Sequence, residues 1–347
     1  MKISHRKIGP DHPPFIIAEM SGNHNQSLDR ALELVDAAAQ SGAHALKMQT
    51  YTADTMTINL GDGDFRINDS TSLWAGRSLY DLYQEAHTPW EWHEKIFNRA
   101  VEHGMIAFST PFDDTAVDFL EGLGAPCYKI ASFENTDLPL IRKVASTGKP
   151  MIISTGMASV AELDASVQTA RNAGAKDIIL LKCTSAYPAT PAAANLATIP
   201  HLRQLFGCEV GLSDHTMGIG VAVAGTVLGA TVIEKHFTLS RVEGGVDSAF
   251  SMEPAEMAAL VRETERAWQA VGHIKYGTSK DDEKSKAFRR SLYVVEDVKV
   301  GGTITPHNVR AIRPGFGLPP ADLERVMGRT VARDIKRGTA LSWDLIR

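Results

Sequence analysis

Two histidines close two consecutive predicted β-strands, and they are the residues whose type and spacing best suit chemistry. His215 follows the apolar run 209–212, and His236 follows the run 231–234. Because parallel pairing brings the carboxyl ends of consecutive strands side by side, we expect the two imidazoles to lie together. Neutral imidazoles at the mouth of a sheet suit a divalent metal ion. Either histidine alone would more simply be a hydrogen-bonded packing residue, but the matched pair favours metal ligation.

Polar side chains also end the other predicted strands. In a packed core each of them would need a buried partner, so this density suits an anion-binding pocket. Hydroxyls and lysines supply donors for phosphate and carboxylate groups, while Glu19 and Glu134 could act as general acid or base. The alternative for a serine or threonine here is an ordinary helix N-cap, which fits Ser109, Thr155 and Thr184 best. The residues at these strand ends are Glu19, Lys47, Gln49, Ser109, Thr110, Lys129, Ser132, Glu134, Ser154, Thr155, Lys182, Thr184, Ser185, Tyr187, Ser213, Asp214 and Glu234.

The elements that must position these residues alternate between short apolar runs and amphipathic stretches. Gly42, Gly104 and Gly174 each follow an amphipathic stretch, where a left-handed helix end favours glycine. Eight strand–helix units in one run predict an α/β protein with a (β/α)8 barrel. The alternative is an open doubly wound sheet, but the Gly-x-Gly-x-x-Gly motif is missing after the first strand. The predicted strands are Phe15–Ala18, Ala45–Gln49, Ile106–Ser109, Cys127–Ala131, Met151–Ser154, Ile178–Lys182, Glu209–Leu212 and Thr231–Glu234.

One predicted connection, between Thr50 and Trp90, is much longer than the others. It is polar, and it contains the aromatic residues Trp74, Tyr80 and Tyr83. Long connections inside a compact domain are more often functional than idle, so we expect a lid or wall over the barrel mouth. A self-stabilised surface excursion is the alternative.

The character of the sequence changes after the predicted barrel. The segment 275–290 is dense in charge and breaks the strand–helix rhythm, as a linker would. Strand-like runs at Leu292–Val295 and Val331–Ala332 then alternate with glycine and proline turn signals. We expect a barrel domain at 1–274, a linker at 275–290 and a small domain at 291–347, which is too short to be stable without support from a barrel.

Composition excludes several classes of function. Apolar residues make up 44% of the chain and charged residues 22%, and the net charge is −5. This charge gives no overall attraction to nucleic acid or anionic membrane, and no apolar run approaches the length of a membrane span. The three cysteines form no paired motif, which suits a reducing compartment. We therefore expect a cytoplasmic protein that binds small molecules and binds neither nucleic acid nor membrane.

These residues by themselves indicate a metal-assisted reaction on a small, phosphorylated, carbonyl-containing substrate. A class II aldolase and a condensing enzyme both fit that chemistry. A non-catalytic sugar-binding protein is a more distant alternative, because it would be expected to lack some of the strand-end lysines and histidines.

Motifs along nearly the whole chain resemble those of the sialic acid synthase family. They are Ile17-Ala18-Glu19, Asn23-His24-Asn25, Lys47-Met48-Gln49-Thr50, Ser109-Thr110-Pro111-Phe112, Tyr128-Lys129-Ile130-Ala131-Ser132, Ser154-Thr155-Gly156-Met157, Gly211-Leu212-Ser213-Asp214-His215-Thr216 and Glu234-Lys235-His236-Phe237. The C-terminal segment resembles the antifreeze-like SAF domain of that family, with Arg313-Pro314-Gly315-Phe316-Gly317 at its arginine motif. The resemblance implies a (β/α)8 TIM barrel followed by a small SAF domain.

The resemblance also implies an activity and roles for particular residues. Members of this family are transferases that condense phosphoenolpyruvate with an N-acetylated amino-sugar aldehyde. By resemblance, His215 and His236 would hold Mn²⁺ (Mg²⁺ or Co²⁺ being alternatives), and Glu19 would transfer a proton or orient water. The residues implied for phosphoenolpyruvate are Lys47, Thr110, Lys129, Ser132, Ser154, Ser185 and Ser213. The residues implied for the sugar are Gln49, Glu134, Tyr187, Asp247 and Arg313, of which Arg313 would reach the partner's barrel in a domain-swapped homodimer.

Within the family, several segments are most similar to the subfamily that makes pseudaminic acid. Examples are Leu79-Tyr80-Asp81-Leu82-Tyr83 and Thr88-Pro89-Trp90-Glu91-Trp92-His93. Two departures from the sialic acid pattern agree with this, namely Asn25-Gln26 in place of Asn-Gly, and Ser185-Ala186 where an Asn usually precedes Tyr-Pro. The substrate implied is 2,4-diacetamido-2,4,6-trideoxy-L-altrose, and flagellin glycosylation is the pathway implied. N-acetylneuraminate and legionaminic acid synthases are the alternatives.

Overall fold

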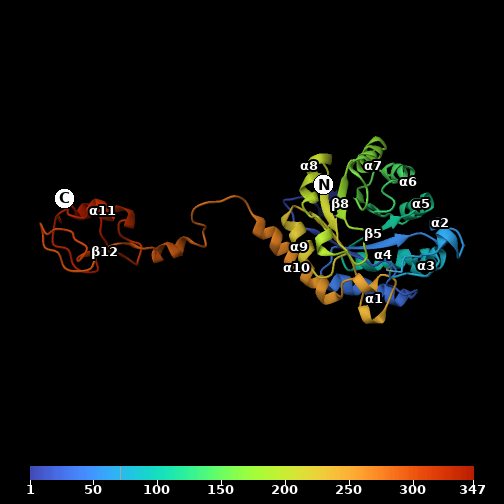
Figure 1. Cartoon of the computed structure of the whole chain (residues 1–347), viewed down its shortest axis with the longest axis horizontal. Helices are drawn as coiled ribbons and strands as arrows, with labels where there is room; N and C mark the ends of the chain where they lie inside the picture. Colours follow the sequence, from blue (N-terminus) through green and yellow to red (C-terminus); the bar gives the residue numbers. More distant parts are fainter. Residues whose placement is uncertain (71) are drawn as a thin grey trace. The chain divides into compact units, whose positions relative to one another are not determined.

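The computed structural model describes residues 1–70 and 72–347. These residues form two compact units, Met1–Gly272 and His273–Arg347 (Figure 1). The first unit contains the strand ends discussed above, and the second contains the C-terminal segment with Arg313.

The first unit is a closed barrel of eight parallel strands among the residues described, which confirms the predicted (β/α)8 fold. Each strand pairs with its neighbours along the chain, and β10 closes the barrel by pairing with β3, so that His236 stands opposite Glu19. The order in the barrel therefore follows the order in the sequence. The barrel strands are β3 (Phe15–Glu19), β4 (Ala45–Thr50), β5 (Ile106–Pro111), β6 (Tyr128–Ile130), β7 (Met151–Ser154), β8 (Ile178–Cys183), β9 (Glu209–Ser213) and β10 (Val232–His236).

Helices cover the outside of the barrel (Figure 1). Local signals in the sequence begin and end them, since Ser27 and Ser159 cap the first turns of α1 and α7 with their side chains, and Gly207 ends α8 in the left-handed conformation. The helices of this unit are α1 (Leu28–Gln40), α2 (Ala53–Met56), α3 (Leu79–Ala86), α4 (His93–Glu102), α5 (Asp114–Gly122), α6 (Leu138–Ala145), α7 (Val160–Asn172), α8 (Thr198–Phe206), α9 (Gly220–Val227) and α10 (Pro254–Val271).

Apolar side chains fill two layers of the barrel unit. The larger layer lies between the strands and the surrounding helices, and it includes Leu34, Met48 and Ile153. The smaller layer fills the interior of the barrel near the amino ends of the strands, where Phe15 and Phe108 are fully buried. A hairpin of β1 (Lys2–Ile3) and β2 (Arg6–Lys7) adds residues to this inner layer, which leaves only the carboxyl end of the barrel open for a site.

The second unit has its own small core. Leu292, Val309, Val331 and Leu341 are buried there. Its strands β11 (Ser291–Val294) and β12 (Val309–Ile312) pair antiparallel, and one short helix, α11 (Leu323–Val326), follows. The predicted strand at Val331–Ala332 is wrong in extent, because within the described chain Val331 makes only an isolated bridge to Ile346.

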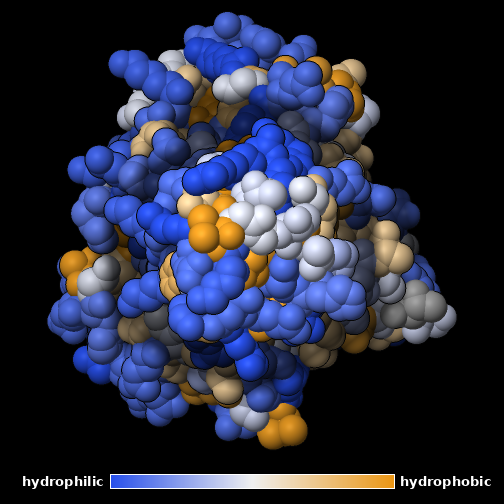
Figure 2. Space-filling model, turned by 90° about the vertical axis from the view of Figure 1, so that its left-hand side faces the viewer, coloured by the Kyte–Doolittle hydropathy of each residue, from blue (hydrophilic) through white to orange (hydrophobic). Residues whose placement is uncertain are grey.

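In residues 1–70 and 72–347, every helix is too short or too polar to cross a bilayer. The face shown in Figure 2 is mostly hydrophilic, and its apolar residues are scattered rather than gathered into one large patch.

Candidate active site

The alternation of side chains along the strands explains which residues reach the barrel interior. On β3, Phe15 and Ile17 fill the inner apolar layer, so Glu19, two residues further, also points inward. The same spacing of two places polar residues above buried apolar ones on the other strands. By this rule the inward-facing set at the carboxyl end is Glu19, Lys47, Gln49, Thr110, Lys129, Ser154, Cys183, Ser213, Glu234 and His236.

Lys182 illustrates the opposite case. Ile178 and Leu180, which point to the same face of β8 as Lys182, belong to the layer beneath the helices. The Lys182 ammonium group donates to the Cys183 carbonyl and to Thr184 Oγ1. Of these two strand-end lysines, Lys129 therefore lines the pocket and Lys182 does not.

Two lysines and two glutamates form a buried charge network at the base of the pocket. Lys47 Nζ lies 2.6 Å from Glu19 Oε2 and 3.8 Å from Glu234 Oε2, and Lys129 Nζ lies 3.6 Å from Glu234 Oε1. All four residues are almost completely buried. Since the two ammonium groups and the two carboxylates balance in charge, an anionic ligand entering here would compete with the carboxylates for the ammonium groups.

Burial and neighbouring charge set the proton affinities in this network. Burial raises the pKa of Glu19, and the nearby Glu234 carboxylate adds to that effect. The pKa of Lys47 is raised, because Glu19 and Glu234 outweigh the desolvation that burial imposes. Burial lowers the pKa of Lys129, whereas the two lysines depress the pKa of Glu234 despite its burial. Glu19 is thus the carboxyl group of the network that most readily accepts a proton.

Hydroxyl groups surround the two lysines. Lys129 Nζ donates to Ser154 Oγ over 2.7 Å, and Lys47 Nζ donates to Thr110 Oγ1 over 3.2 Å. Ser213 Oγ donates to Glu234 Oε1 over 3.0 Å. The structure thus brings together the residues expected for phosphoenolpyruvate, with Ser132 and Ser185 hydrogen-bonded to each other at the rim over 2.9 Å.

The two histidines lie side by side, with ring centroids 5.3 Å apart. His215 Nδ1 lies 3.0 Å from the Thr184 carbonyl, to which it donates, so its Nε2 carries the lone pair. His236 Nδ1 is buried without a hydrogen-bond partner, and it lies 3.8 Å from Asp247 Oδ2. Burial holds the pKa of His236 well below its usual value, so this ring stays neutral.

This pair fits a metal ion bound by few protein ligands. No set of three or more histidine, cysteine, aspartate or glutamate side chains is arranged to hold a metal within the described ranges. The orphaned nitrogen of His236 and the fixed tautomer of His215 nevertheless supply two donors, and a catalytic site needs positions left open for water and substrate.

A hydrogen-bonded chain that the sequence did not predict runs from Asp247, which lies 3.8 Å from His236, to the charge network. Asp247 accepts a hydrogen bond from Ser21 Oγ. Gln49 Nε2 then donates to both Ser21 Oγ, at 3.1 Å, and Glu19 Oε1, at 3.0 Å. Sequence reasoning assigned no role to Ser21, although its place two residues after a strand-end glutamate was a usable signal.

The remaining predicted residues divide between the two units. Glu134 and Tyr187 line the same pocket, whose volume is about 400 Å³. The Tyr187 ring contacts His215 with centroids 4.6 Å apart, and burial raises the pKa of Glu134 to about 7.

Arg313 is exposed on the second unit, directly after β12. The long connection forms a wall of this pocket through Trp74 and α3, as predicted.

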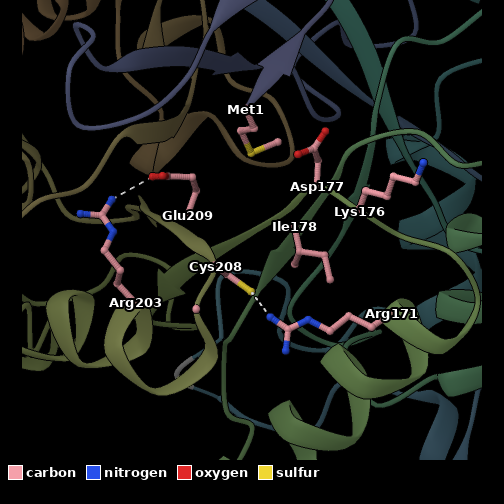
Figure 3. A pocket seen from close by; sticks show the side chains of 9 residues that line it. Met1, Arg171, Lys176, Asp177, Ile178, Arg203, Cys208 and Glu209 are labelled. Carbon is pink, nitrogen blue, oxygen red and sulfur yellow. Dashed lines mark hydrogen bonds and ion pairs between the residues drawn. The ribbon is translucent and has the colours of Figure 1, made fainter.

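A second cavity, of about 440 Å³, lies at the amino ends of β8 and β9 (Figure 3). It is also rich in charge, but its two arginines are engaged with neighbouring groups. Arg203 pairs with Glu209 at 2.9 Å, and Arg171 donates to the Phe206 carbonyl at 2.5 Å and contacts Cys208 Sγ at 3.6 Å. These contacts are typical of helix ends that are held in place, and no candidate residue from the sequence lies there.

The fold and the pocket together define a (β/α)8-barrel enzyme with a polar, metal-competent site at the carboxyl ends of its strands. Residues 34–276 match the NeuB family, and residues 289–347 match the SAF domain. The chain belongs to the NeuB family, which confirms the resemblance to sialic acid synthases.

Relatives with stated activities agree with this membership. The chain is 42% identical to pseudaminic acid synthase of Helicobacter pylori, across 96% of this chain and 97% of that protein. It is 35% identical to N,N'-diacetyllegionaminic acid synthase of Legionella pneumophila, across 99% of each. The crystal structure of N-acetylneuraminic acid synthetase from Leptospira borgpetersenii superposes with a TM-score of 0.72 at 31% identity, over 82% of this chain and 94% of that one.

Proposed function

We propose that this enzyme condenses phosphoenolpyruvate with 2,4-diacetamido-2,4,6-trideoxy-L-altrose and water to give pseudaminic acid and phosphate. The observation that carries the proposal is the 42% identity with a pseudaminic acid synthase over almost the full length of both chains. The relative that makes a legionaminic acid is less similar, at 35%. N-acetylneuraminate and legionaminic acid synthases remain the alternatives within the family.

The base of the pocket is proposed to bind phosphoenolpyruvate. Lys47 and Lys129 supply the two buried positive charges, and their hydroxyl partners Thr110 and Ser154 supply directed donors. Ser213 would join them once its present acceptor, Glu234, turns toward a lysine. Ser132 and Ser185 complete the set from the rim. In the reaction, the methylene carbon of phosphoenolpyruvate forms a bond to the aldehyde carbon of the sugar, water adds to the carbon that carries the phosphate, and phosphate leaves.

His215 and His236 are the proposed ligands of a divalent ion, with Mn²⁺ as our first choice. When bound, such an ion supplies Lewis-acid polarisation of an aldehyde oxygen. Asp247 lies 3.8 Å from His236 and is hydrogen-bonded to Ser21. The sugar is proposed to bind on this side of the pocket. Glu19, held by Gln49 and Lys47, is placed to take up a proton or orient water between the two substrates.

The outer part of the pocket is proposed to bind the sugar through Glu134, Tyr187, Asp247 and Gln49. Glu134 Oε2 is buried without a hydrogen-bond partner, so it offers a free acceptor for an acetamido N–H group. The Tyr187 ring lies beside His215, tilted by 54° to it, and offers an aromatic face. The three cysteines are unpaired and buried, which supports our proposal that the enzyme works in the reducing cytoplasm.

A product assay by mass spectrometry tests the proposed reaction. Purified protein, Mn²⁺ and phosphoenolpyruvate would be incubated in parallel with 2,4-diacetamido-2,4,6-trideoxy-L-altrose, the corresponding mannose isomer and N-acetylmannosamine. We expect product from the altrose sugar alone, and loss of product with EDTA. Product from either other sugar would keep the condensation and overturn the sugar assignment, whereas no product from any would overturn the proposed function.

We also propose a domain-swapped homodimer in which Arg313 of one subunit reaches the sugar in the barrel of the other. Support comes from the exposed position of Arg313 and from the small core of its unit. Mixing inactive Arg313→Ala and His236→Ala subunits provides a test, because each heterodimer would contain one intact pair of barrel and SAF domain. Recovery of roughly a quarter of the wild-type activity after subunit exchange is expected from random pairing. No recovery in an exchanged mixture would refute the swap.

A further inference from the structure

The pocket at the carboxyl end of the barrel has two parts of opposite character. Its base is charged and hydroxyl-rich, as described above. Its outer part combines the polar residues proposed for the sugar with an apolar wall, and most of that wall comes from the long connection between β4 and α4. The apolar wall consists of Met56, Ile67, Trp74, Leu79, Leu82 and Val246.

Hydrogen bonds hold this wall in place before any ligand binds. Ile67 and its partners close a turn, since Ile67 N donates to the Arg77 carbonyl and Gly76 N donates to the Ile67 carbonyl. Ser78 then caps α3, the helix that carries Leu79 and Leu82. Across the pocket, Trp74 Nε1 donates to the Val246 carbonyl over 3.0 Å. A wall fixed in this way discriminates between ligands without a large ordering cost.

The chemistry at the base determines which end of the sugar meets the wall. The aldehyde carbon must lie beside the histidine pair and the two lysines, where the new carbon–carbon bond forms. In an open-chain hexose, C6 is the atom furthest from that carbon, so it points toward the outer part of the pocket. The substituent at C6 is therefore the one most exposed to the apolar wall.

We propose that the wall of Met56, Ile67, Trp74, Leu79, Leu82 and Val246 selects sugars with a methyl group at C6. This specificity role rests on the proposed condensation and deepens it. A C6 hydroxyl would lose its water against the wall, and most of these side chains offer it no hydrogen-bond partner. Apolar pockets reject such an added hydroxyl by about 10- to 100-fold in kcat/KM.

Near-isosteric polar substitutions test the wall directly. Leu79→Asn and Met56→Gln keep the approximate side-chain volume and introduce a hydrogen-bonding group. Leu60→Asn is the matched control, since Leu60 lies in the same connection, is 44% exposed and lies outside the pocket lining. The measurement is the ratio of kcat/KM for a 6-deoxy sugar to that for its 6-hydroxy counterpart of the same configuration.

We expect the wild type and the Leu60→Asn control to prefer the 6-deoxy sugar by about 10- to 100-fold, and each wall variant to lower that ratio by about tenfold. Equal rates for the two sugars in the wild type, or a ratio that the wall variants leave unchanged, would overturn the proposal.

The experiment separates this inference from the sugar assignment, because the 6-deoxy sugar and its 6-hydroxy counterpart can be compared in both the altrose and the mannose configuration. If only mannose-configured sugars react, the proposed function fails while the C6 preference is still measured on them. If no sugar of either configuration reacts, the proposed condensation and the role of the wall are both refuted.

Discussion

The two ends of the barrel hold cavities of similar size, and both are rich in charged side chains. At the amino end, none of the nine lining residues has a buried side-chain polar atom without a hydrogen-bond partner. At the carboxyl end, Glu134 Oε2, Glu234 Oε2 and His236 Nδ1 are buried and have none. Charge alone therefore does not distinguish the two cavities, whereas buried lining groups without partners do.

The physical difference lies in what each end must do. At the amino end, Arg171 binds the end of a helix and Arg203 binds Glu209, which stabilises the fold. These contacts leave few hydrogen-bonding groups of the arginines free for a ligand. The carboxyl end keeps lysines and carboxylates in a network of balanced charge that an anion can rearrange. Open hydrogen-bonding capacity of this kind is costly unless a ligand or metal ion completes it.

Removing a proposed metal ligand should produce the largest difference between the ends. We expect His236→Ala to lower kcat by about 1,000-fold, because Lewis-acid polarisation contributes several kcal/mol to the transition state. Turnover would be followed by phosphate release, and folding by circular dichroism. A folded His236→Ala enzyme with near-normal turnover would break the assignment of the metal site.

Truncating a buried lysine should have the next largest effect. Lys129→Ala removes the ammonium group 2.7 Å from Ser154 and leaves Glu234 with one fewer cation. We expect kcat/KM for phosphoenolpyruvate to fall by about 100-fold, the cost of losing a charged hydrogen bond. Lys182→Ala is the matched control, because that lysine lies on a strand of the same barrel but outside the pocket lining. Equal losses in the two variants would contradict the inward-facing assignment.

The pH dependence of sugar use should sharpen the account of Glu134. Burial raises its pKa to about 7, so the acceptor carboxylate is protonated as the pH falls below neutrality. We expect kcat/KM for the sugar to decline up to tenfold per pH unit below about pH 7, and Glu134→Gln to flatten that part of the profile. A wild-type pH profile without this decline in kcat/KM would show that Glu134 is not the group contacting the sugar.

At the amino end, pH should change stability and leave turnover alone. His44 Nδ1 accepts a hydrogen bond from Ile16 N at 2.9 Å, and burial lowers its pKa to about 3. The unfolded chain then binds the proton more readily, so the stability is fully present above about pH 6.5 and is lost as the pH falls toward 3. His44→Gln should reduce the slope of unfolding free energy with pH by up to about 1.4 kcal/mol per pH unit. An unchanged slope in urea titrations at pH 4 to 6 would count against this contact.

The smallest effect should come from the partly exposed ion pair in the amino-end cavity. Arg203→Ala removes the 2.9 Å contact with Glu209, and pairs of this kind contribute about 1 kcal/mol or less. Turnover should stay within about twofold of wild type. A large loss of turnover with intact folding would mean that the amino end has a functional role.

Sequence patterns predicted the barrel because its signals are local and repeated eight times among the described residues. The site residues on strands were predictable for the same reason, since the spacing of two places Glu19, Lys47, Lys129 and Glu234 on one interior surface. Lys182 was grouped with the site residues because it is a polar residue near a strand end. The alternation of side chains along β8 instead points it away from the barrel interior, like Ile178 and Leu180.

The rest of the site depends on contacts between distant segments, which local patterns do not encode. Ser21 meets Asp247 across 226 residues, and Trp74 meets Val246 across 172 residues. The apolar wall likewise arises from a connection whose sequence is mostly polar. Arg313 was expected beside the sugar on resemblance alone, and its place in an assembly remains a proposal.

Calorimetric titration of phosphoenolpyruvate in the presence of Mn²⁺ would test the central claim most directly. Wild type, Lys129→Ala and Arg203→Ala would be compared, since each variant removes one cation from one end of the barrel. We predict that Lys129→Ala abolishes measurable binding and that Arg203→Ala binds like the wild type. Binding that survives in Lys129→Ala and is lost in Arg203→Ala would move the anion site to the other end of the barrel and contradict the account.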